Sequence, residues 1–300
     1  MTVNGPLHVD ELPIEEALVR ALVVDQLPAL AGLPLGTLPA QGSSNALFRL
    51  GSELLVRLPR QPGGSVGITK EARWGPAVGS ALPVAVPEVL AVGEPGHGYP
   101  ERWSVVRWLD GTVPAAPAPL ASDLAELVLA LRGLDVPTEA LHDPALRSYR
   151  GEDLLDRDAD TRADLLACRQ IRGLDLDLDG VLEVWDRAME LPLAAVTPGW
   201  LHGDLVAENL LVRDGRLTAL LDLGGLAVGD PTVDLAVAWD LLDRPGREAF
   251  RQAVGADDDT WLRARGWALG LALMTLPYYW TSMPQRCAGR LAMLRAVLEG

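Results

Sequence analysis

Lysine is almost absent from this chain. Lys70 is the only lysine among 26 basic residues, which stand against 41 acidic ones and leave a net charge of −15. A general nucleic-acid-binding protein needs a basic face, so this balance argues against that class. Any chemistry that requires a lysine has a single candidate.

Cysteine and histidine are also scarce. Cys168 and Cys287 are the only cysteines, and there are four histidines. A disulfide framework and a structural zinc site built from these residue types are therefore excluded. Two lone cysteines are typical of a reducing compartment.

Long apolar runs are missing as well. The most apolar late stretch, residues 267–280, contains Pro277 and falls short of the roughly 20 residues that a membrane span requires. The N-terminal segment has neither a basic start nor an apolar core, so no signal peptide is expected. We therefore expect a cytoplasmic protein with no membrane partner, and nothing in the sequence indicates an obligate protein partner.

What is present divides the chain into a β-rich part and a helical part. The pattern predicts a helix over 14–30, strands over 33–40, 45–51, 53–59, 86–93 and 99–109, and a helix over 70–82 inside this strand series. A two-residue turn at Gly51-Ser52 is expected between the second and third strands. The fold class is thus α+β, with an N-terminal lobe of residues 1–108 and a C-terminal lobe of residues 109–300.

The second part begins with a proline-rich connector at residues 112–120. Helices are predicted over 121–134, 181–191, 232–254 and 258–298, the first of them capped by Ser122 or Asp123. Asp230-Pro231 has the pattern of a helix cap followed by proline at the first helical position. Residues 140–180 are polar and acid-rich and have no assignable period.

The candidate chemistry lies in residues 202–234. Asp204 follows His202-Gly203, Asn209 precedes an apolar run, and Asp222 ends the next one. A hairpin turn at Asp214-Gly215 would bring the two runs side by side, so that Asn209 and Asp222 lie at neighbouring strand ends. One carboxylate and one amide oxygen suit Mg²⁺, and Asp204 nearby could accept a proton from a substrate hydroxyl.

This segment resembles the catalytic core of the aminoglycoside phosphotransferase family, protein-kinase-like enzymes that phosphorylate small molecules. The pattern H-G-D-x-x-x-x-N followed by I-D-x-G reads here as His202-Gly203-Asp204, Asn209 and Leu221-Asp222-Leu223-Gly224. The resemblance implies a two-lobe kinase-like fold that uses ATP or GTP with Mg²⁺. Asp204 would be the catalytic base, and Asn209 and Asp222 would be the metal ligands. Residues 206–208, Val-Ala-Glu, differ from the residues that are commonest at these positions in the family.

The resemblance extends upstream to residues expected at the nucleotide. Ser43 and Ser44 stand in the loop that would cover the phosphates, and Arg57 and Glu71 stand where kinases place a strand lysine and its helix partner. Lys70 adjoins Glu71 and cannot face it on one helix, because neighbouring side chains point apart. The backbone of Arg107 and Leu109 would meet the adenine edge.

The implied function is ATP-dependent phosphorylation of a hydroxyl on a small molecule, an antibiotic such as an aminoglycoside. Macrolide kinases and other natural-product or metabolite kinases share the motifs. A catalytically silent nucleotide-binding interaction module is the alternative from another class.

Two kinds of acceptor fit the sequence. Aspartates crowded at 152–164 and 175–179 would attract a cationic one. Tyr278, Tyr279 and Trp280 would instead support a bulky apolar one.

Overall fold

The computed structural model describes residues 7–38, 42–193 and 197–300. By their internal contacts, these residues form two compact units, each of which is described by itself. The first comprises the described residues up to Ser80, then Ala85–Asp110 and Leu220–Gly224, and the second comprises Ala81–Val84, Gly111–Ala219 and Gly225–Gly300. The short segment around Asp222 is therefore part of the first unit, although the strand before it belongs almost entirely to the second.

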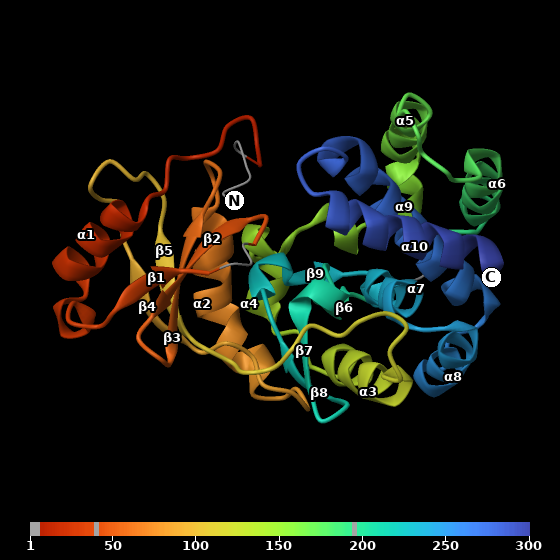
Figure 1. Ribbon diagram of the computed structural model, residues 1–300. Coiled ribbons are helices and arrows are strands. Elements are labelled where there is room, and N and C mark those ends of the chain that lie inside the picture. Colours follow the sequence, from red (N-terminus) through yellow and green to blue (C-terminus); the bar gives the residue numbers. More distant parts are fainter. Residues whose placement is uncertain (1–6, 39–41, 194–196) are drawn as a thin grey trace. The chain divides into compact units, whose positions relative to one another are not determined.

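The first unit is a five-stranded antiparallel sheet with the strand order β1-β2-β3-β5-β4. Its strands are β1 (Leu35–Thr37), β2 (Asn45–Leu50), β3 (Leu54–Pro59), β4 (Val89–Gly93) and β5 (Trp103–Arg107). Helices α1 (Glu16–Gln26) and α2 (Ser65–Gly79) flank this sheet (Figure 1). The five predicted strands and the inserted helix are confirmed, with α2 beginning earlier than expected. The predicted strand over 33–40 includes two residues outside the described ones.

The core of this unit lies between the sheet and α1. Val19 and Leu22 of the helix pack with Val56 and Leu58 of β3, and all four side chains are fully buried. Because side chains alternate along a strand, Arg57 is directed to the opposite face, where α2 lies. The β2–β3 connection has three residues, since Leu50 pairs with Leu54. The prediction of a two-residue turn was therefore one residue short.

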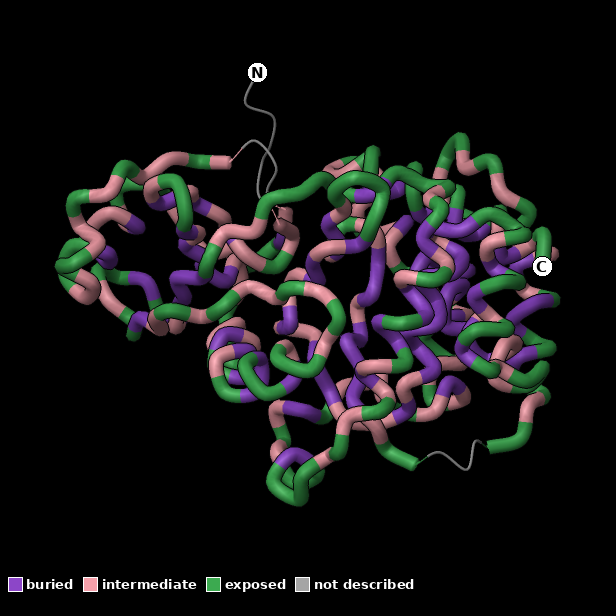
Figure 2. The backbone as a smooth tube through the Cα atoms, turned by 90° about the horizontal axis from the view of Figure 1, so that it is seen from below, coloured by how far each residue is buried: buried purple, intermediate pink, exposed green. Residues whose placement is uncertain are grey.

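The second unit is mainly helical. Its helices are α3 (Ala121–Arg132), α4 (Thr138–His142), α5 (Asp158–Cys168), α6 (Leu178–Met189), α7 (Val237–Leu241), α8 (Arg244–Val254), α9 (Asp258–Tyr279) and α10 (Pro284–Glu299). Helix α9 packs against α5, α6 and α10. Fully buried side chains such as Leu269 and Leu273 run along it, and buried segments gather in the interior of this unit (Figure 2). No helix in the described part of the chain combines the length and hydropathy that a bilayer span needs.

Two small two-stranded sheets carry the motif segment. Strand β6 (Gly199–Leu201) pairs with β9 (Ala227–Gly229), and β7 (Leu210–Arg213) forms a hairpin with β8 (Arg216–Leu220). The predicted turn at Asp214-Gly215 is confirmed, because both residues have the positive φ angles that a tight hairpin requires. The β6–β9 pair was not predicted, since three-residue strands carry too little alternation to be recognised.

Two cap predictions had opposite outcomes. Asp230 accepts a hydrogen bond from the backbone N–H of Thr232 and begins the short 3₁₀ helix η7 (Pro231–Ala236), as the Asp-Pro pattern predicted. Helix α3 has no side-chain cap, so the prediction of Ser122 or Asp123 in that role was wrong. Asp123 instead accepts hydrogen bonds from Arg216 and from the backbone of Leu217, and so ties α3 to strand β8.

Candidate active site

In the first unit, a buried guanidinium joins two carboxylates. Arg57 Nη1 lies 2.8 Å and 2.7 Å from the two carboxylate oxygens of Glu71, and Nη2 lies 3.1 Å from Oδ1 of Asp222. Arg57 is 5% exposed and Glu71 1%. Burial favours the neutral form of Arg57, but Glu71 and Asp222 outweigh it and raise the pKa of Arg57. The structure thus brings three sequence-predicted residues together around one positive charge.

Glu71 is held in place because α2 is anchored at its first turn. The carboxylate of Glu101, from the segment before β5, accepts hydrogen bonds from the backbone N–H groups of Gly63 and Ser65, each at 2.8 Å. Burial opposes the charge of Glu101, yet the Ser65 hydroxyl and these two amides together lower its pKa. A negative charge at this end of a helix also complements the helix dipole. Sequence reasoning did not find Glu101, because its partners lie far away in the chain.

Asp222 has an unusual backbone. Its φ angle is +58°, in the left-handed region that side chains other than glycine adopt rarely. Leu223 packs against α2 at Gly75, where a Cβ would lie 3.5 Å from its Cδ1 atom. A Cβ on Gly224 would lie 3.0 Å from Oδ1 of Asp222, so a side chain here would crowd the carboxylate that Arg57 holds. The strained conformation presents a carboxylate whose side chain remains 36% exposed while Arg57 holds one oxygen.

In the second unit, the loop that begins at His202 is held by a buried carboxylate. Asp234 of η7 accepts the backbone N–H of His202 at 2.7 Å and that of Gly203 at 2.9 Å. Asp234 is 2% exposed, and this burial raises its pKa despite both hydrogen bonds and the neighbouring His202. Gly203 has a φ of +79°, and a Cβ there would lie only 2.9 Å from the carbonyl oxygen of Gly225. The motif glycine is therefore required by both conformation and space.

Asp204 and Asn209 lie side by side. The Nδ2 atom of Asn209 donates to the backbone oxygen of Asp204 at 2.9 Å and to its Oδ2 atom at 3.2 Å. The Asp204 side chain is 41% exposed, so one side of the carboxylate remains accessible. Asp240 of α7 accepts the backbone N–H of Ala207 at 2.7 Å, which fixes the loop between the two motif residues.

Arg150 is the functional neighbour that sequence reasoning missed. Its Nη1 atom lies 2.6 Å from Oδ1 of Asp204 and 2.7 Å from the carbonyl oxygen of Gly203. Burial alone would raise the pKa of Asp204, but the charge of Arg150, with His202 and Arg290, lowers it. Arg150 lies in η3 (Tyr149–Gly151), inside the acid-rich segment that has no period. No local pattern marked it, since the contact spans more than fifty residues of chain.

The acid-rich segments are used within the second unit. Asp153 and Asp177 accept backbone N–H groups at the starts of η4 (Leu154–Arg157) and α6. The other paired members of the two runs are Asp158 with Arg162, Asp160 with Arg157, Asp175 with Arg295, and Asp179 with Arg169. Most of the charge that suggested a cationic acceptor is therefore engaged in caps and ion pairs.

The remaining nucleotide candidates lie in the first unit. Ser43 and Ser44 precede β2, and their carbonyl oxygens accept hydrogen bonds from His8 Nε2 and from the backbone of Arg60, respectively. Gln41, the first residue of this predicted phosphate loop, lies outside the described residues. Arg107 ends β5, and its exposed side chain pairs with Glu88, while Leu109 follows two residues later. These contacts are all within the protein, and they do not show whether the loop or the end of β5 binds a nucleotide.

The ligand chemistry fits a metal that is held jointly with substrate. Among the described residues, no group of three or more His, Cys, Asp or Glu side chains is arranged to hold a metal ion. Mg²⁺ is usually bound by one or two carboxylates together with substrate phosphates and water. In the first unit Asp222 offers a carboxylate whose side chain is 36% exposed, and in the second unit Asn209 offers an amide oxygen, so each unit by itself presents one oxygen donor of the kind that Mg²⁺ prefers.

Comparison with known proteins gives a family for this chain. The model of the "Phosphotransferase enzyme family" matches residues 36–267. An aminoglycoside 3'-phosphotransferase from Escherichia coli is 34% identical over 61 residues, which is 20% of this chain and 22% of that relative. The chain thus matches about a fifth of the length of this curated relative.

Solved structures share the fold over nearly their whole length. The GDP and kanamycin complex of APH(2")-IIia has a TM-score of 0.71 at 17% identity, covering 93% of this chain and 97% of that chain. The macrolide 2'-phosphotransferase MphH from Brachybacterium faecium has a TM-score of 0.59 at 22% identity, covering 93% of this chain and 98% of that chain.

These similarities define the class as an α+β, protein-kinase-like fold with a small antiparallel sheet unit and a larger helical unit. Within that class, the chain belongs to the phosphotransferase enzyme family.

Proposed function

We propose that this protein transfers the terminal phosphoryl group of ATP to a hydroxyl of a small-molecule antibiotic. An aminoglycoside is the first candidate acceptor and a macrolide the second, as the names of its relatives suggest. The observation that carries the proposal is Asp204, an accessible carboxylate beside Asn209 in a loop fixed by buried Asp234. Use of ATP implies action in the cytoplasm.

Each unit has its own task in this proposal. Residues 1–108 form the nucleotide lobe, in which the positive charge of Arg57, held by Glu71 and Asp222, offsets phosphate charge. Ser43 and Ser44 donate to phosphate oxygens, and the backbone of Arg107 and Leu109 meets the adenine edge. Residues 109–300 form the lobe that carries the catalytic loop and binds the acceptor.

Mg²⁺ would be held by Asn209 and Asp222, and when bound it neutralises charge on the transferring phosphates. The positive charge of Arg57 keeps Asp222 oriented, because the two side chains are joined at 3.1 Å. Gly224 has no side chain to crowd the carboxylate of Asp222.

The acceptor step is assigned to Asp204. The acceptor oxygen forms a new bond to phosphorus as the bond from phosphorus to the ADP oxygen breaks. The hydroxyl proton passes to Asp204 and then to water. A carboxylate with a lowered pKa is a weak base, so orientation of the hydroxyl contributes more than proton affinity.

The variant Asp204→Asn tests this assignment. The amide keeps the size of the side chain but cannot take a proton, so transfer should fall by about 10²–10⁴-fold while ATP affinity stays within a few-fold. Asp214→Asn is the matched control, because Asp214 is an exposed turn residue near Asp204 in the chain. Both variants are assayed with ATP against kanamycin and erythromycin. Near-normal transfer by Asp204→Asn would exclude Asp204 as the base.

A further inference from the structure

A chain of contacts in the second unit leads from a packed tyrosine to the proposed base. Arg150 Nε donates to the hydroxyl of Tyr149 at 2.9 Å, and Nη1 reaches Asp204 Oδ1 at 2.6 Å. The Arg150 side chain is 23% exposed. One guanidinium therefore connects the half-buried Tyr149 with the carboxylate that faces the acceptor.

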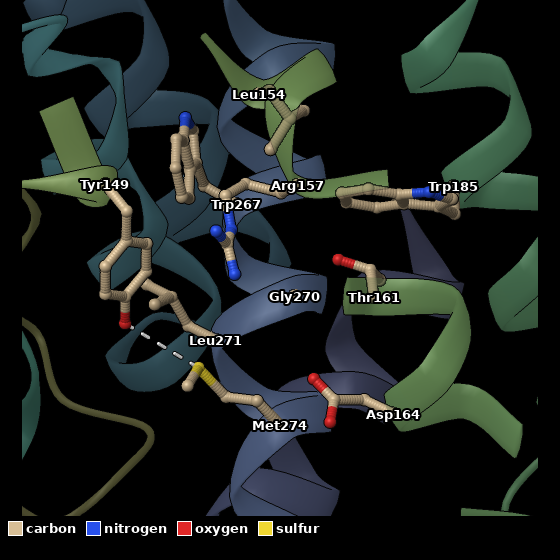
Figure 3. A pocket seen from close by; sticks show the side chains of 10 residues that line it. All are labelled: Tyr149, Leu154, Arg157, Thr161, Asp164, Trp185, Trp267, Gly270, Leu271 and Met274. Carbon is tan, nitrogen blue, oxygen red and sulfur yellow. Dashed lines mark hydrogen bonds between the residues drawn. The ribbon is translucent and has the colours of Figure 1, made fainter. Parts of the chain in front are cut away.

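Tyr149 is itself fixed. Its hydroxyl contacts Met274 Sδ at 3.8 Å, and the Arg157 guanidinium lies 4.6 Å from the ring centre. Figure 3 shows Tyr149 at one wall of a small cavity, with Thr161 and Asp164 of α5 at the opposite wall. The cavity volume of about 20 Å³ is enough for one water molecule and too small for an acceptor.

Both oxygens of Asp204 have one protein partner each. Arg150 contacts Oδ1 and Asn209 contacts Oδ2, which fixes the plane of the carboxylate. An ionised carboxylate has about four acceptor positions, so each oxygen retains one for an incoming hydroxyl. Arg150 also binds the carbonyl oxygen of Gly203 and so fixes the carboxylate relative to its own backbone.

Several arginines of the second unit pair with the carboxylates around Asp204. Arg290 of α10 pairs with Asp240 at 2.7 Å, and Arg286 pairs with Glu208 at 2.7 Å. The neighbouring charged groups are Arg150, Arg286, Arg290, Glu208, Asp240 and His202. Arg150, Arg286 and Arg290 lie among the carboxylates of Asp204, Glu208 and Asp240, so a substrate ammonium group would meet positive charge that is already present.

We propose that Arg150 is a positioning residue that orients Asp204 and occupies the place where a cationic acceptor would otherwise pair with it. The acceptor class follows: a hydroxyl whose adjacent carbon atoms carry no ammonium group. Like charges placed side by side repel, so an ammonium beside the reacting hydroxyl would meet Arg150. An aromatic ring lies beside each of two arginines in this region: Tyr149 beside Arg150, and Tyr279 beside Arg286, whose guanidinium is 5.4 Å from the ring centre. This inference rests on the proposed role of Asp204.

The first experiment needs no identified acceptor. Intrinsic ATP hydrolysis, in which water replaces the acceptor, is measured for wild type, Arg150→Ala, Arg150→Lys and Arg169→Ala. Loss of orientation should lower kcat of Arg150→Ala by roughly 10–100-fold while KM for ATP is unchanged. Lysine should restore part of the rate, and guanidinium chloride far below denaturing concentrations should restore part of it to Arg150→Ala. Arg169→Ala, which removes an arginine of the second unit that pairs with Asp179 and contacts neither Tyr149 nor Asp204, should retain the wild-type rate.

The second experiment tests acceptor charge with kanamycin and its fully N-acetylated derivative, which keeps the hydroxyls and loses the ammonium charges. Arg150→Ala should shift the ratio of their kcat/KM values towards kanamycin by roughly tenfold. If wild type and Arg150→Ala have equal kcat and equal acceptor ratios, the positioning role is wrong. If Asp204→Asn also retains full activity, the proposed function itself is wrong, so the two failures are distinguishable. If neither form of kanamycin is turned over, the positioning role is decided by the first experiment alone. An unchanged ATP hydrolysis rate in Arg150→Ala, or no rescue by guanidinium, then contradicts that role.

Discussion

The carboxylate of Asp234 holds the backbone of Gly203 at a distance of 2.9 Å. Its other oxygen holds the neighbouring His202, so one side chain satisfies two consecutive buried N–H groups. The base loop is thereby fixed from a 3₁₀ helix that lies thirty residues further along the chain. A group that acts in this way contributes through orientation, without contact with a substrate.

Asp234→Asn should therefore impair both stability and turnover. The amide can accept only one of the two N–H groups and presents its own N–H₂ to the other. We expect a loss of about 1–3 kcal/mol in the free energy of unfolding and of roughly 10–100-fold in kcat, with little change in KM for ATP. Urea unfolding and steady-state kinetics measure the two effects. Asp230→Asn is the control, because Asn also serves well as a cap. Equal behaviour of the two variants would contradict the role of Asp234.

The contribution of Arg57 to stability should be separable from its contribution to nucleotide binding. Arg57→Ala leaves Glu71 buried and unpaired, which should cost about 3–5 kcal/mol of stability. The double variant Arg57→Met with Glu71→Leu replaces the pair by apolar groups and should recover most of that stability. It should not recover ATP affinity, because the positive charge is missing. Arg57→Lys should retain partial activity, since it keeps the charge but not the planar fork.

Thermal unfolding and KM for ATP check these expectations. Wild-type ATP affinity in the stable double variant would show that Arg57 has only a structural role.

Asp222→Asn should weaken the response to Mg²⁺ while preserving the local fold. Asparagine tolerates the left-handed backbone that Asp222 adopts, so the substitution removes charge without adding strain. We expect the Mg²⁺ concentration for half-maximal nucleotide binding to rise by at least roughly tenfold, because a charged metal ligand is lost. Asp214→Asn serves as the control, since Asp214 also has a positive φ angle. An unchanged Mg²⁺ titration would show that the metal is bound elsewhere.

Much of this fold was predictable because its signals are local. The β-hairpin at Asp214-Gly215, the cap at Asp230 and the strands that carry Arg57 and Arg107 all have turn residues or alternation within a few positions. The motif residues Asp204 and Asn209 were recognisable for the same reason, since they are separated by only five positions.

The missed residues act over long sequence separations. Arg150 reaches Asp204 from a segment of short 3₁₀ turns, where no period exists to be read. Asp123 was expected to cap its own helix, but the partners that it found lie on strand β8. A carboxylate near a helix start can satisfy either the local amides or a distant strand, and only the tertiary packing decides between them.

The pH dependence of stability should reveal the Glu101 anchor of α2. The folded-state pKa of Glu101 is lowered from its ordinary value, mainly by the Ser65 hydroxyl and by the amides of Gly63 and Ser65, against the opposing effect of burial. Its contribution is therefore fully present above the unfolded-state pKa of about 4.3 and is lost as the pH falls through the lower folded-state value.

Glu101→Gln should be less stable than wild type by about 1–3 kcal/mol at pH 7, because hydrogen bonds to a charged acceptor are weakened or lost. The difference should begin to shrink as the pH falls below about 4.3, where the unfolded wild type takes up a proton, and it should be lost below the lower folded-state pKa, where the folded side chain is neutral as well. Glu94→Gln is the matched control: Glu94 pairs with Arg102 in an exposed position, so its effect should stay below about 1 kcal/mol. Urea unfolding at several pH values provides the measurement. A stability difference between Glu101→Gln and wild type that is constant across this range would show that the charge of Glu101 does not anchor the helix.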